Sequence, residues 1–207
     1  LFYSLGNAEI GITPLMHKPV TGEDGYFLLL LSPQLESAKT TVIPRDVVLV
    51  LDTSGSMDNV KMDQARRALR HCLSNLNAND RFGVIGFASN VRPYRDSLVE
   101  AKPDQIDDAK KWVEALRAGG GTNIQAALNK ALSMRTDEDR SFTVVFFTDG
   151  QPTIGEMKPE KIVKEVSEKN SKNTRMFTFG VGDDVNAALL DQLAENTRAV
   201  STYVRPA

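Results

Sequence analysis

Residues 45–57 read Arg-Asp-Val-Val-Leu-Val-Leu-Asp-Thr-Ser-Gly-Ser-Met, and this stretch decides the fold. Residues 47–51 form an unbroken apolar run, which is typical of a parallel strand buried on both faces, since a half-exposed strand would alternate. The run stops at Asp52, a small polar loop follows, and a helical pattern begins near Val60. One carboxylate and two hydroxyls therefore lie at the carboxyl end of a core strand, where ligands bind in open α/β sheets.

The loop itself carries three oxygen-bearing side chains at close spacing, Asp52, Ser54 and Ser56. Short side chains of this kind favour a hard cation such as magnesium, which prefers an octahedron of oxygens and keeps several waters. The same residue types also cap helices, so the loop alone does not distinguish a metal site from a capped helix.

Length and composition are those of one large α/β domain: the chain has 207 residues, and 41% of them are hydrophobic. A net charge of −2, without a run of Lys or Arg, gives no electrostatic basis for binding nucleic acid. No apolar stretch approaches ~20 residues, so no membrane-spanning segment is predicted. The single cysteine, Cys72, excludes an internal disulfide, and the start at Leu1 without an initiator methionine or a signal peptide suggests a piece of a longer protein.

The first forty residues differ in character from the rest of the chain. Residues 11–19 read as extended, proline-punctuated chain, residues 21–25 as a turn, and residues 26–31 as a strongly apolar strand. Residues 32–44 have the composition of a linker. Because a run such as Phe-Leu-Leu-Leu-Leu should not face water, we expect this strand to pack on the main domain.

Beyond residue 60, helical and strand patterns alternate. Helical spacing or composition predicts helices at residues 60–76, 106–116, 124–134, from Pro159 onward and around 189–194. Apolar runs predict strands at residues 82–87, 141–147, 176–181 and 199–204, and residues 91–98 come after so short a turn that they should pair antiparallel. The alternation predicts a doubly wound, Rossmann-like, mostly parallel sheet with helices on both faces and the strand-to-helix loops on one edge.

Polar residues from separate parts of the chain fall on that edge. Thr122 follows a run of three glycines, and Asp149 ends the strand of residues 141–147. Their convergence with the loop after Asp52 is hard to explain by helix capping, and it favours a cation site. Cys72 lies in the middle of a helical apolar stripe, so we expect a buried, inert thiol.

Together, Asp52-x-Ser54-x-Ser56, Gly121-Thr122 and Thr148-Asp149-Gly150 resemble the complete metal-ion-dependent adhesion site of a von Willebrand factor type A domain, over roughly residues 45–204. Two flanking stretches narrow the resemblance: Gly25-Tyr26-Phe27, which leads through a linker into Arg45-Asp46-Val47-Val48, and the ending Ser201-Thr202-Tyr203-Val204-Arg205-Pro206. They are similar to the heavy chains of the inter-alpha-trypsin inhibitor, and we expect a bacterial relative of these proteins. The resemblance implies six strands in the order 3-2-1-4-5-6, with residues 91–98 as the antiparallel edge. It also implies that residues 1–44 are the tail and linker of a preceding β-rich domain, that residues 45–207 are the A domain, and that the protein is extracellular or in the cell envelope.

The resemblance assigns a role to five residues. Ser54 and Ser56 ligate the metal through their hydroxyls, Thr122 ligates directly when a partner is bound, and Asp52 and Asp149 hold coordinating waters or bind directly. Neutral hydroxyls quench little of a divalent charge, so magnesium, manganese or calcium stays electrophilic toward an Asp or Glu of a protein partner. The implied function is a cation-dependent, adhesion-type protein-binding module without catalysis.

An enzyme is the alternative, either a magnesium-dependent phosphohydrolase or a nucleotide-binding α/β domain. The glycines before Thr122 could cradle a phosphate, and Asp52 and Asp149 could position magnesium. However, no Lys-Ser or Lys-Thr follows the glycines, and position 54 is Ser where an Asp-x-Asp phosphatase has its acid. The two histidines, His17 and His71, are not placed to act as a general base, so no catalytic residue is assigned.

Two departures from the family pattern limit what is carried over. Asn59 and Val60 stand where integrin β-type A domains have further acidic residues, so we expect no second, adjacent cation site. A domains also finish with a helix after the last strand, and this chain ends at Ala207. We therefore expect part of one sheet face to lack cover, which the apolar segment at residues 26–31 or a neighbouring molecule should supply.

Overall fold

The computed structural model describes residues 10–20, 22, 24–33, 43–57, 59–136, 139–170 and 174–205, and it divides into two compact units, Leu1–Val42 and Ile43–Ala207. The first unit contains an antiparallel hairpin of β1 (Ile10–His17) and β2 (Tyr26–Pro33). Sequence analysis predicted the second strand and the turn, but not the pairing of the first strand with it. Phe27 is 77% exposed. That this strand packs on the A domain stays a prediction, and the predicted linker lies mostly outside the described residues.

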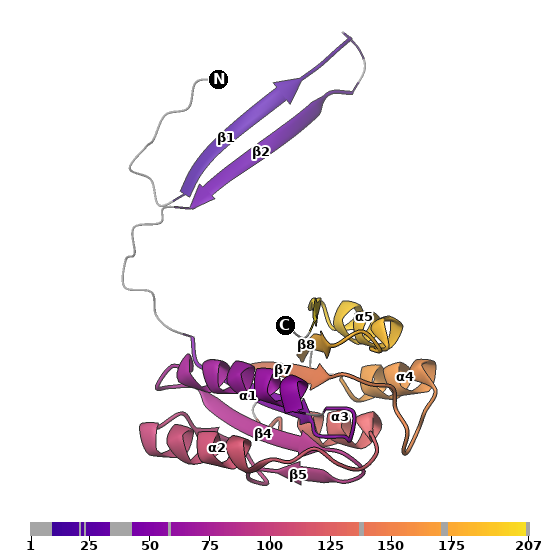
Figure 1. Cartoon of the computed structure of the whole chain (residues 1–207). Coiled ribbons are helices and arrows are strands. Elements are labelled where there is room, and N and C mark those ends of the chain that lie inside the picture. The colour runs from indigo at the N-terminus through magenta and orange to yellow at the C-terminus, as the bar shows by residue number, and fades with distance from the viewer. Residues whose placement is uncertain are drawn as a thin grey trace. The chain divides into compact units, whose positions relative to one another are not determined.

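The second unit is built around a mostly parallel sheet with β3 at its centre (Figure 1). Its strands are β3 (Arg45–Asp52), β4 (Arg81–Phe87), β5 (Val91–Pro93), β6 (Val99–Glu100), β7 (Ser141–Thr148), β8 (Arg175–Val181) and β9 (Ser201–Val204). The spatial order is β5-β4-β3-β7-β8-β9, and β5 and β6 both pair antiparallel with β4. This confirms the predicted α/β fold and the order 3-2-1-4-5-6.

The antiparallel edge differs in detail from the single strand predicted at residues 91–98. Pairing with β4 is split between β5 and the two-residue β6. Pro93 is tolerated here because its nitrogen faces away from β4, and the Tyr94 N–H still donates to the Val84 carbonyl at 2.7 Å. The next residue, Tyr94, is 7% exposed, and its ring stacks on Phe82 with the centroids 6.4 Å apart. Burial of this ring draws the chain toward the core before it returns to β4.

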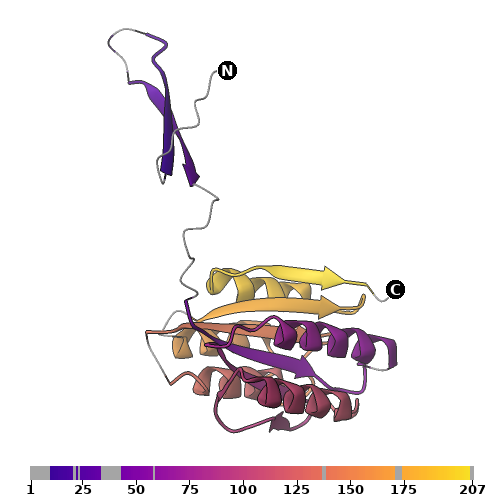
Figure 2. The same cartoon turned by 90° about the vertical axis from the view of Figure 1, so that its left-hand side faces the viewer.

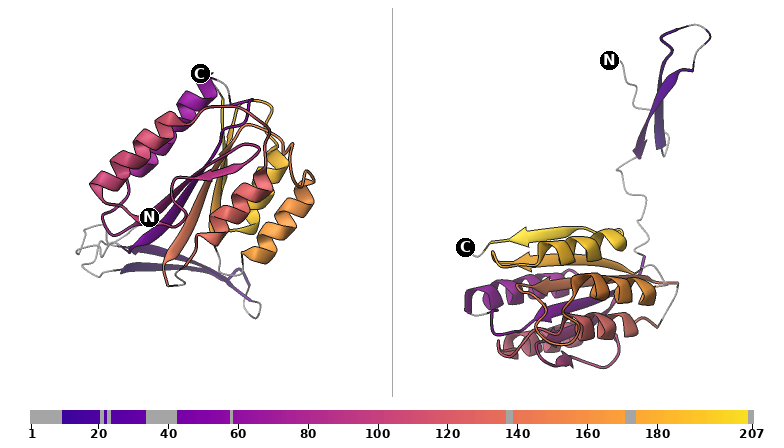
Figure 3. Two further views of the ribbon diagram at one scale, coloured as in Figure 1. Left: turned by 90° about the horizontal axis from the view of Figure 1, so that it is seen from below. Right: turned by 90° about the vertical axis from the view of Figure 1, so that its right-hand side faces the viewer.

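Helices cover both faces of the sheet (Figure 3). They are α1 (Asn59–Ser74) and α2 (Pro103–Ala115) on one face and α3 (Ile124–Ser133), α4 (Pro159–Lys169) and α5 (Ala187–Asn196) on the other. Alternate residues of β3 enter the two cores: Leu49 and Leu51 pack on the side of α1, and Val48 and Val50 on the side of α3. Each of the four is at most 1% exposed. The unbroken apolar run exists because both faces of this strand are buried.

On the face of α1 and α2, an apolar groove of about 230 Å³ lies between α1 and strands β7 to β9. Figure 2 shows α1 and α2 in front of the sheet, with the arrows of β8 and β9 visible above them. Phe147, Phe179 and Val204 line its sheet side, and Cys72 lines its helix side. That a further helix is missing from this sheet face stays a prediction. The prediction that Cys72 is buried is wrong: the residue is only partly buried, because no helix lies against this side of α1 in the described residues. Burial still raises the pKa of the thiol.

The parallel strands all end at one edge of the sheet, so the loops after β3 and β7 meet there. The loop that leads into α3 joins them through backbone hydrogen bonds. Among the described residues, no helix combines the length and the apolar character that crossing a lipid bilayer requires.

Candidate metal-ion site

Asp52, the last residue of β3, is fully buried at the carboxyl edge of the sheet. The Ser54 N–H donates to its Oδ1 at 2.8 Å, and the Thr148 hydroxyl donates to its Oδ2 at 2.6 Å. Both donors are neutral, and no cationic side chain of the described residues pairs with this carboxylate. Burial raises the pKa of Asp52 to about 6; these hydrogen bonds oppose the rise, and the nearby charge of Asp149 adds to it.

The second carboxylate, Asp149, follows β7 and is 1% exposed. The Ser56 hydroxyl donates to its Oδ1 at 2.8 Å, and the hydroxyls of Ser54 and Ser56 lie 3.1 Å apart. The ammonium of Lys61, from the first turn of α1, donates to its Oδ2 at 2.7 Å. Ser56 is exposed whereas Ser54 and Asp149 are buried, so the cluster reaches solvent through Ser56.

Thr122 reaches the same place from the loop before α3. Its N–H donates to the Thr153 hydroxyl at 2.8 Å, and its carbonyl accepts from the N–H groups of Thr153 and Ile154. A Cβ placed on Gly150 would lie 3.6 Å from Ser56 Oγ and 4.0 Å from Thr122 Oγ1, so the two hydroxyls flank this glycine. The Thr122 hydroxyl makes no hydrogen bond with the described residues, and it is therefore available as a ligand.

Close packing of the backbone explains why glycines precede Thr122. Gly55 N–H donates to the Gly120 carbonyl at 3.0 Å and Gly119 N–H to the Thr53 carbonyl at 2.8 Å, which ties this loop to the one after β3. Gly120 has a φ of 86°, a conformation that L side chains rarely adopt, and a Cβ there would come within 2.9 Å of Ser89 Oγ. The positive φ and the close approach to Ser89, in the turn after β4, require glycine at position 120.

The N–H groups of the same loop already have acceptors within the protein. Those of residues 119, 121, 122 and 123 donate to Thr53 O, Ser89 Oγ, Thr153 Oγ1 and Ala88 O. A phosphate-binding loop needs such N–H groups pointing outward and unpaired. These four groups are not available to a phosphate.

The structure thus brings all five predicted site residues to one edge of the sheet, with two carboxylates and three hydroxyls from three loops. Within the described part of the chain, no three His, Cys, Asp or Glu side chains converge, so a cation at this edge depends on the hydroxyls. An oxygen-only set of donors fits magnesium, manganese or calcium and lacks the thiolate and imidazole ligands that favour zinc. Sequence reasoning missed Lys61; its only signal was its place in the first turn of the helix that comes after the loop.

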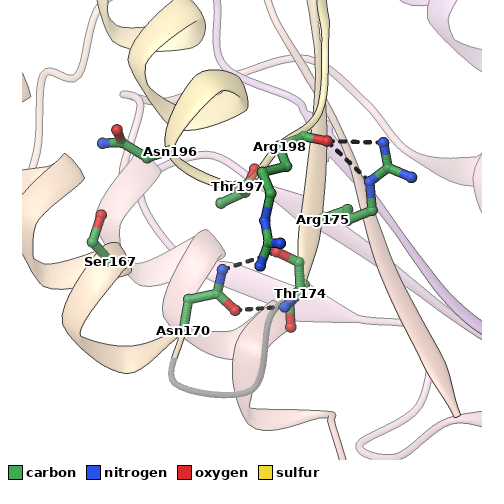
Figure 4. A pocket seen from close by; sticks show the side chains of 7 residues that line it. All are labelled: Ser167, Asn170, Thr174, Arg175, Asn196, Thr197 and Arg198. Atoms are coloured by element: carbon green, nitrogen blue, oxygen red, sulfur yellow. Dashed lines mark hydrogen bonds between the residues drawn. The ribbon is translucent and has the colours of Figure 1, made fainter.

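A polar pocket of about 570 Å³ lies at the other edge of the sheet, at the amino end of β8 and the carboxyl ends of α4 and α5 (Figure 4). Asn170 exchanges two hydrogen bonds with the backbone of Thr174, and the Arg175 guanidinium donates twice to the Arg198 carbonyl. These contacts join the two helices to the strand. The pocket is separate from the five-residue cluster and contains no carboxylate among its lining residues.

Comparison with known proteins agrees with this geometry. The family model of the von Willebrand factor type A domain matches residues 45–201. Inter-alpha-trypsin inhibitor heavy chain H2 of Mesocricetus auratus is 35% identical over 189 residues, which are 87% of this chain and 20% of that protein. Heavy chain H4 of Homo sapiens is 35% identical over 180 residues, 83% of this chain and 19% of that protein. The chain thus spans about a fifth of these relatives.

Two solved structures share the fold. A von Willebrand factor type A protein from Catenulispora acidiphila superposes with a TM-score of 0.74 at 21% identity, covering 94% of this chain and 42% of that one. Proximal thread matrix protein 1 of the mussel byssus, in a structure whose metal-ion-dependent adhesion motif is occupied by zinc, gives a TM-score of 0.62 at 20% identity and covers 78% of this chain and 44% of that one. Family model, fold and sheet order agree: the chain belongs to the von Willebrand factor type A domain family and is related to the inter-alpha-trypsin inhibitor heavy chains.

Proposed function

We propose that the second unit is a divalent-cation-dependent protein-binding module that docks an Asp or Glu of a protein partner onto a bound metal ion. The observation that carries the proposal is the state of Asp52, a fully buried carboxylate held by neutral donors and close to a second carboxylate. Burying two negative charges this close together is costly unless a cation compensates them. A divalent ion bound at this edge would do so.

The roles of the five residues follow from their positions. Ser54 and Ser56, whose hydroxyls are 3.1 Å apart, would ligate the cation directly. Thr122, whose hydroxyl lies beside Gly150 near the Ser56 hydroxyl and has no hydrogen-bond partner among the described residues, would ligate when a partner is bound. Asp52 and Asp149 would hold coordinating waters or bind directly. Such a shell supplies magnesium, manganese or calcium with two charges and leaves a position open for the partner's carboxylate.

The mussel protein with zinc in its adhesion motif supports metal binding on this fold, and the heavy-chain relatives support a role as one module of a longer protein. By the relationship to the heavy chains we propose an extracellular or cell-envelope location; the bacterial origin expected from the sequence stays a prediction. The partner that fits the site presents an exposed acidic side chain that can reach the opening beside Ser56.

The phosphohydrolase or nucleotide-binding alternative has weaker support. Four N–H groups of the glycine loop donate to internal acceptors, and His71 lies in the last turn of α1, where its Nε2 is 3.3 Å from Asn75 Nδ2. A general base is therefore missing beside Asp52 and Asp149 in the described residues. A phosphate-release assay with magnesium tests this alternative directly, and turnover that Asp149→Asn abolishes would favour it.

The proposed function is tested by capture from native extract on the immobilised protein in magnesium, followed by elution with EDTA. We expect at least one protein to elute with EDTA and to be absent when the bait is Thr122→Val, which removes the ligating hydroxyl and keeps the shape. The matched control is Thr202→Val, an exposed threonine of β9 outside the proposed shell. A partner that binds equally in EDTA, or equally to Thr122→Val, would contradict docking through the metal.

A further inference from the structure

One charged group at the site has no part in the proposed function, and it is the ammonium of Lys61. It lies 2.7 Å from Asp149 Oδ2 and 3.3 Å from the Ser56 carbonyl oxygen. The side chain of Lys61 is 20% exposed, and that of Asp149 is fully buried. The lysine therefore covers one oxygen of this carboxylate, while the Ser56 hydroxyl covers the other at 2.8 Å.

The path of the lysine is built into the fold. Its aliphatic stem crosses Gly182, just after β8, where a Cβ would come within 3.0 Å of Lys61 Cε and 3.3 Å of Nζ. Gly182 also has a φ of 103°, which favours glycine. The lysine thus starts on α1, passes the end of β8 and reaches the carboxylate that comes after β7. Packing of the stem on Gly182 and pairing of the charge with Asp149 hold the ammonium at the site.

Charge balance disfavours the presence of the ammonium and a divalent ion at the site together. Asp52 and Asp149 together supply two negative charges, which match one divalent cation. With Lys61 still on Asp149, the site would carry one positive charge in excess, at a few ångströms and partly shielded from water, where repulsion between like charges is strong. Both cations also compete for the oxygens of the same carboxylate.

We infer that Lys61 is a tethered counter-ion that occupies the acidic side of the site and gives up Asp149 when the divalent cation binds. This inference rests on the proposed function. The lysine stabilises the metal-free protein by compensating Asp149, and it lowers the affinity for the cation by the free energy of its displacement. Binding of the metal ion and release of Lys61 from Asp149 are therefore coupled.

The test is isothermal titration of magnesium into EDTA-stripped wild type and Lys61→Gln, whose amide can still donate to Asp149 but carries no charge. Lys61→Gln should bind magnesium on the order of tenfold more tightly than wild type. Lys61→Arg, which keeps the charge, should stay near wild type. Lys164→Gln, which removes a charge from an exposed lysine of α4 paired with Glu168, controls for net charge and should also stay near wild type.

Thermal melts give the second readout. Without metal, Lys61→Gln should melt below wild type, because a buried carboxylate has lost its cation; saturating magnesium should close the gap. Equal or weaker magnesium affinity of Lys61→Gln, with wild type binding normally, would overturn the inference and leave the proposed function standing. If wild type itself binds no magnesium, manganese or calcium, the proposed function fails first and this inference falls with it.

Discussion

Each end of β3 carries a buried aspartate, and the two differ in the donors that surround the carboxylate. Asp46, near the start, accepts two hydrogen bonds from Arg81, at 2.9 and 2.6 Å, and one from Arg140 at 2.8 Å. Within the described ranges, Asp52, at the end, accepts from neutral donors such as the Ser54 backbone N–H and the Thr148 hydroxyl, and from no cationic side chain. Two guanidinium groups saturate the first carboxylate, whereas the second keeps an uncompensated charge. One end of the strand is a structural ion cluster, and the other is suited to take up a cation.

Asp80, just before β4, also has cationic donors at the amino edge and differs from Asp52 in the same way. At the amino edge, burial raises the pKa of Asp80, but hydrogen bonds from Arg45 and from the Asn77 N–H outweigh it and hold the pKa below its usual value. At the carboxyl edge, the pKa of Asp52 is raised to about 6. Burial alone therefore does not decide the charge state; the supply of cationic donors does.

The largest expected effect on stability comes from removing the charge of Asp46, the carboxylate that two arginines compensate. Asp46→Asn should destabilise the fold by about 3 kcal/mol, because it leaves Arg81 and Arg140 without their anion. For a domain of this size that corresponds to a fall in melting temperature of about 6–12 °C. The rise in melting temperature on adding magnesium should match that of wild type. A loss of magnesium response in Asp46→Asn would show that the two ends are coupled.

The same substitution at the other end should act in the opposite direction. Asp52→Asn should stabilise the metal-free protein at pH 7 by about 1–2 kcal/mol, since ~1.4 kcal/mol accompanies each unit by which burial raises the pKa and one hydrogen bond is weakened. It should also remove the stabilisation by magnesium, which is ~2.7 kcal/mol for wild type at a hundredfold excess over the dissociation constant. Urea unfolding with and without magnesium measures both effects.

The sign of the pH dependence is set by the raised pKa. The folded state binds the Asp52 proton more tightly than the unfolded state, so this contribution to stability is complete below pH ~4 and is lost as the pH rises through 6. The difference in stability between Asp52→Asn and metal-free wild type should therefore grow between pH 4 and pH 7. A difference that stays constant over this range would contradict an uncompensated Asp52.

The smallest expected effect on stability belongs to Thr122. It is 3% exposed, so Thr122→Ala would also open space, and Thr122→Val is the cleaner change. Because its hydroxyl has no partner among the described residues and its backbone carries the loop contacts, Thr122→Val should change stability by no more than ~0.5 kcal/mol. It should retain more of the magnesium response than Asp52→Asn. A large loss of stability in metal-free Thr122→Val would mean that the hydroxyl holds the loop.

Sequence reasoning predicted those parts of the molecule that local pattern determines. The apolar run of β3, the helical stripes and the rule that parallel strands end on one edge were enough for the doubly wound, mostly parallel sheet and for bringing the five site residues together. The order of the strands came from the family resemblance. Pairing of β1 with β2 was missed, because prolines and polar residues make the first strand look irregular. The prediction that Cys72 is buried was wrong, because the burial of a helix residue depends on which elements pack against that helix.

The ion pairs at both ends of β3 could not be predicted from spacing. Lys61 and Asp149 are 88 positions apart, and Asp46 and Arg140 are 94 apart. Charged residues are common on every helix and loop, so which of them reach a buried carboxylate is decided by packing in three dimensions. Sequence reasoning therefore found the oxygens of the site and missed the cation that lies on one of them.

The proposed metal site is tested most directly by the position of a bound ion. Crystals of the protein grown with manganese and measured at a wavelength where manganese scatters anomalously locate the ion without reference to any ligand assignment. We expect one anomalous peak at the carboxyl edge of the sheet, within bonding distance of the Ser54 and Ser56 hydroxyls, and Lys61 withdrawn from Asp149. A well-ordered structure at millimolar manganese with no peak there, or with its peak elsewhere, would contradict the proposed site.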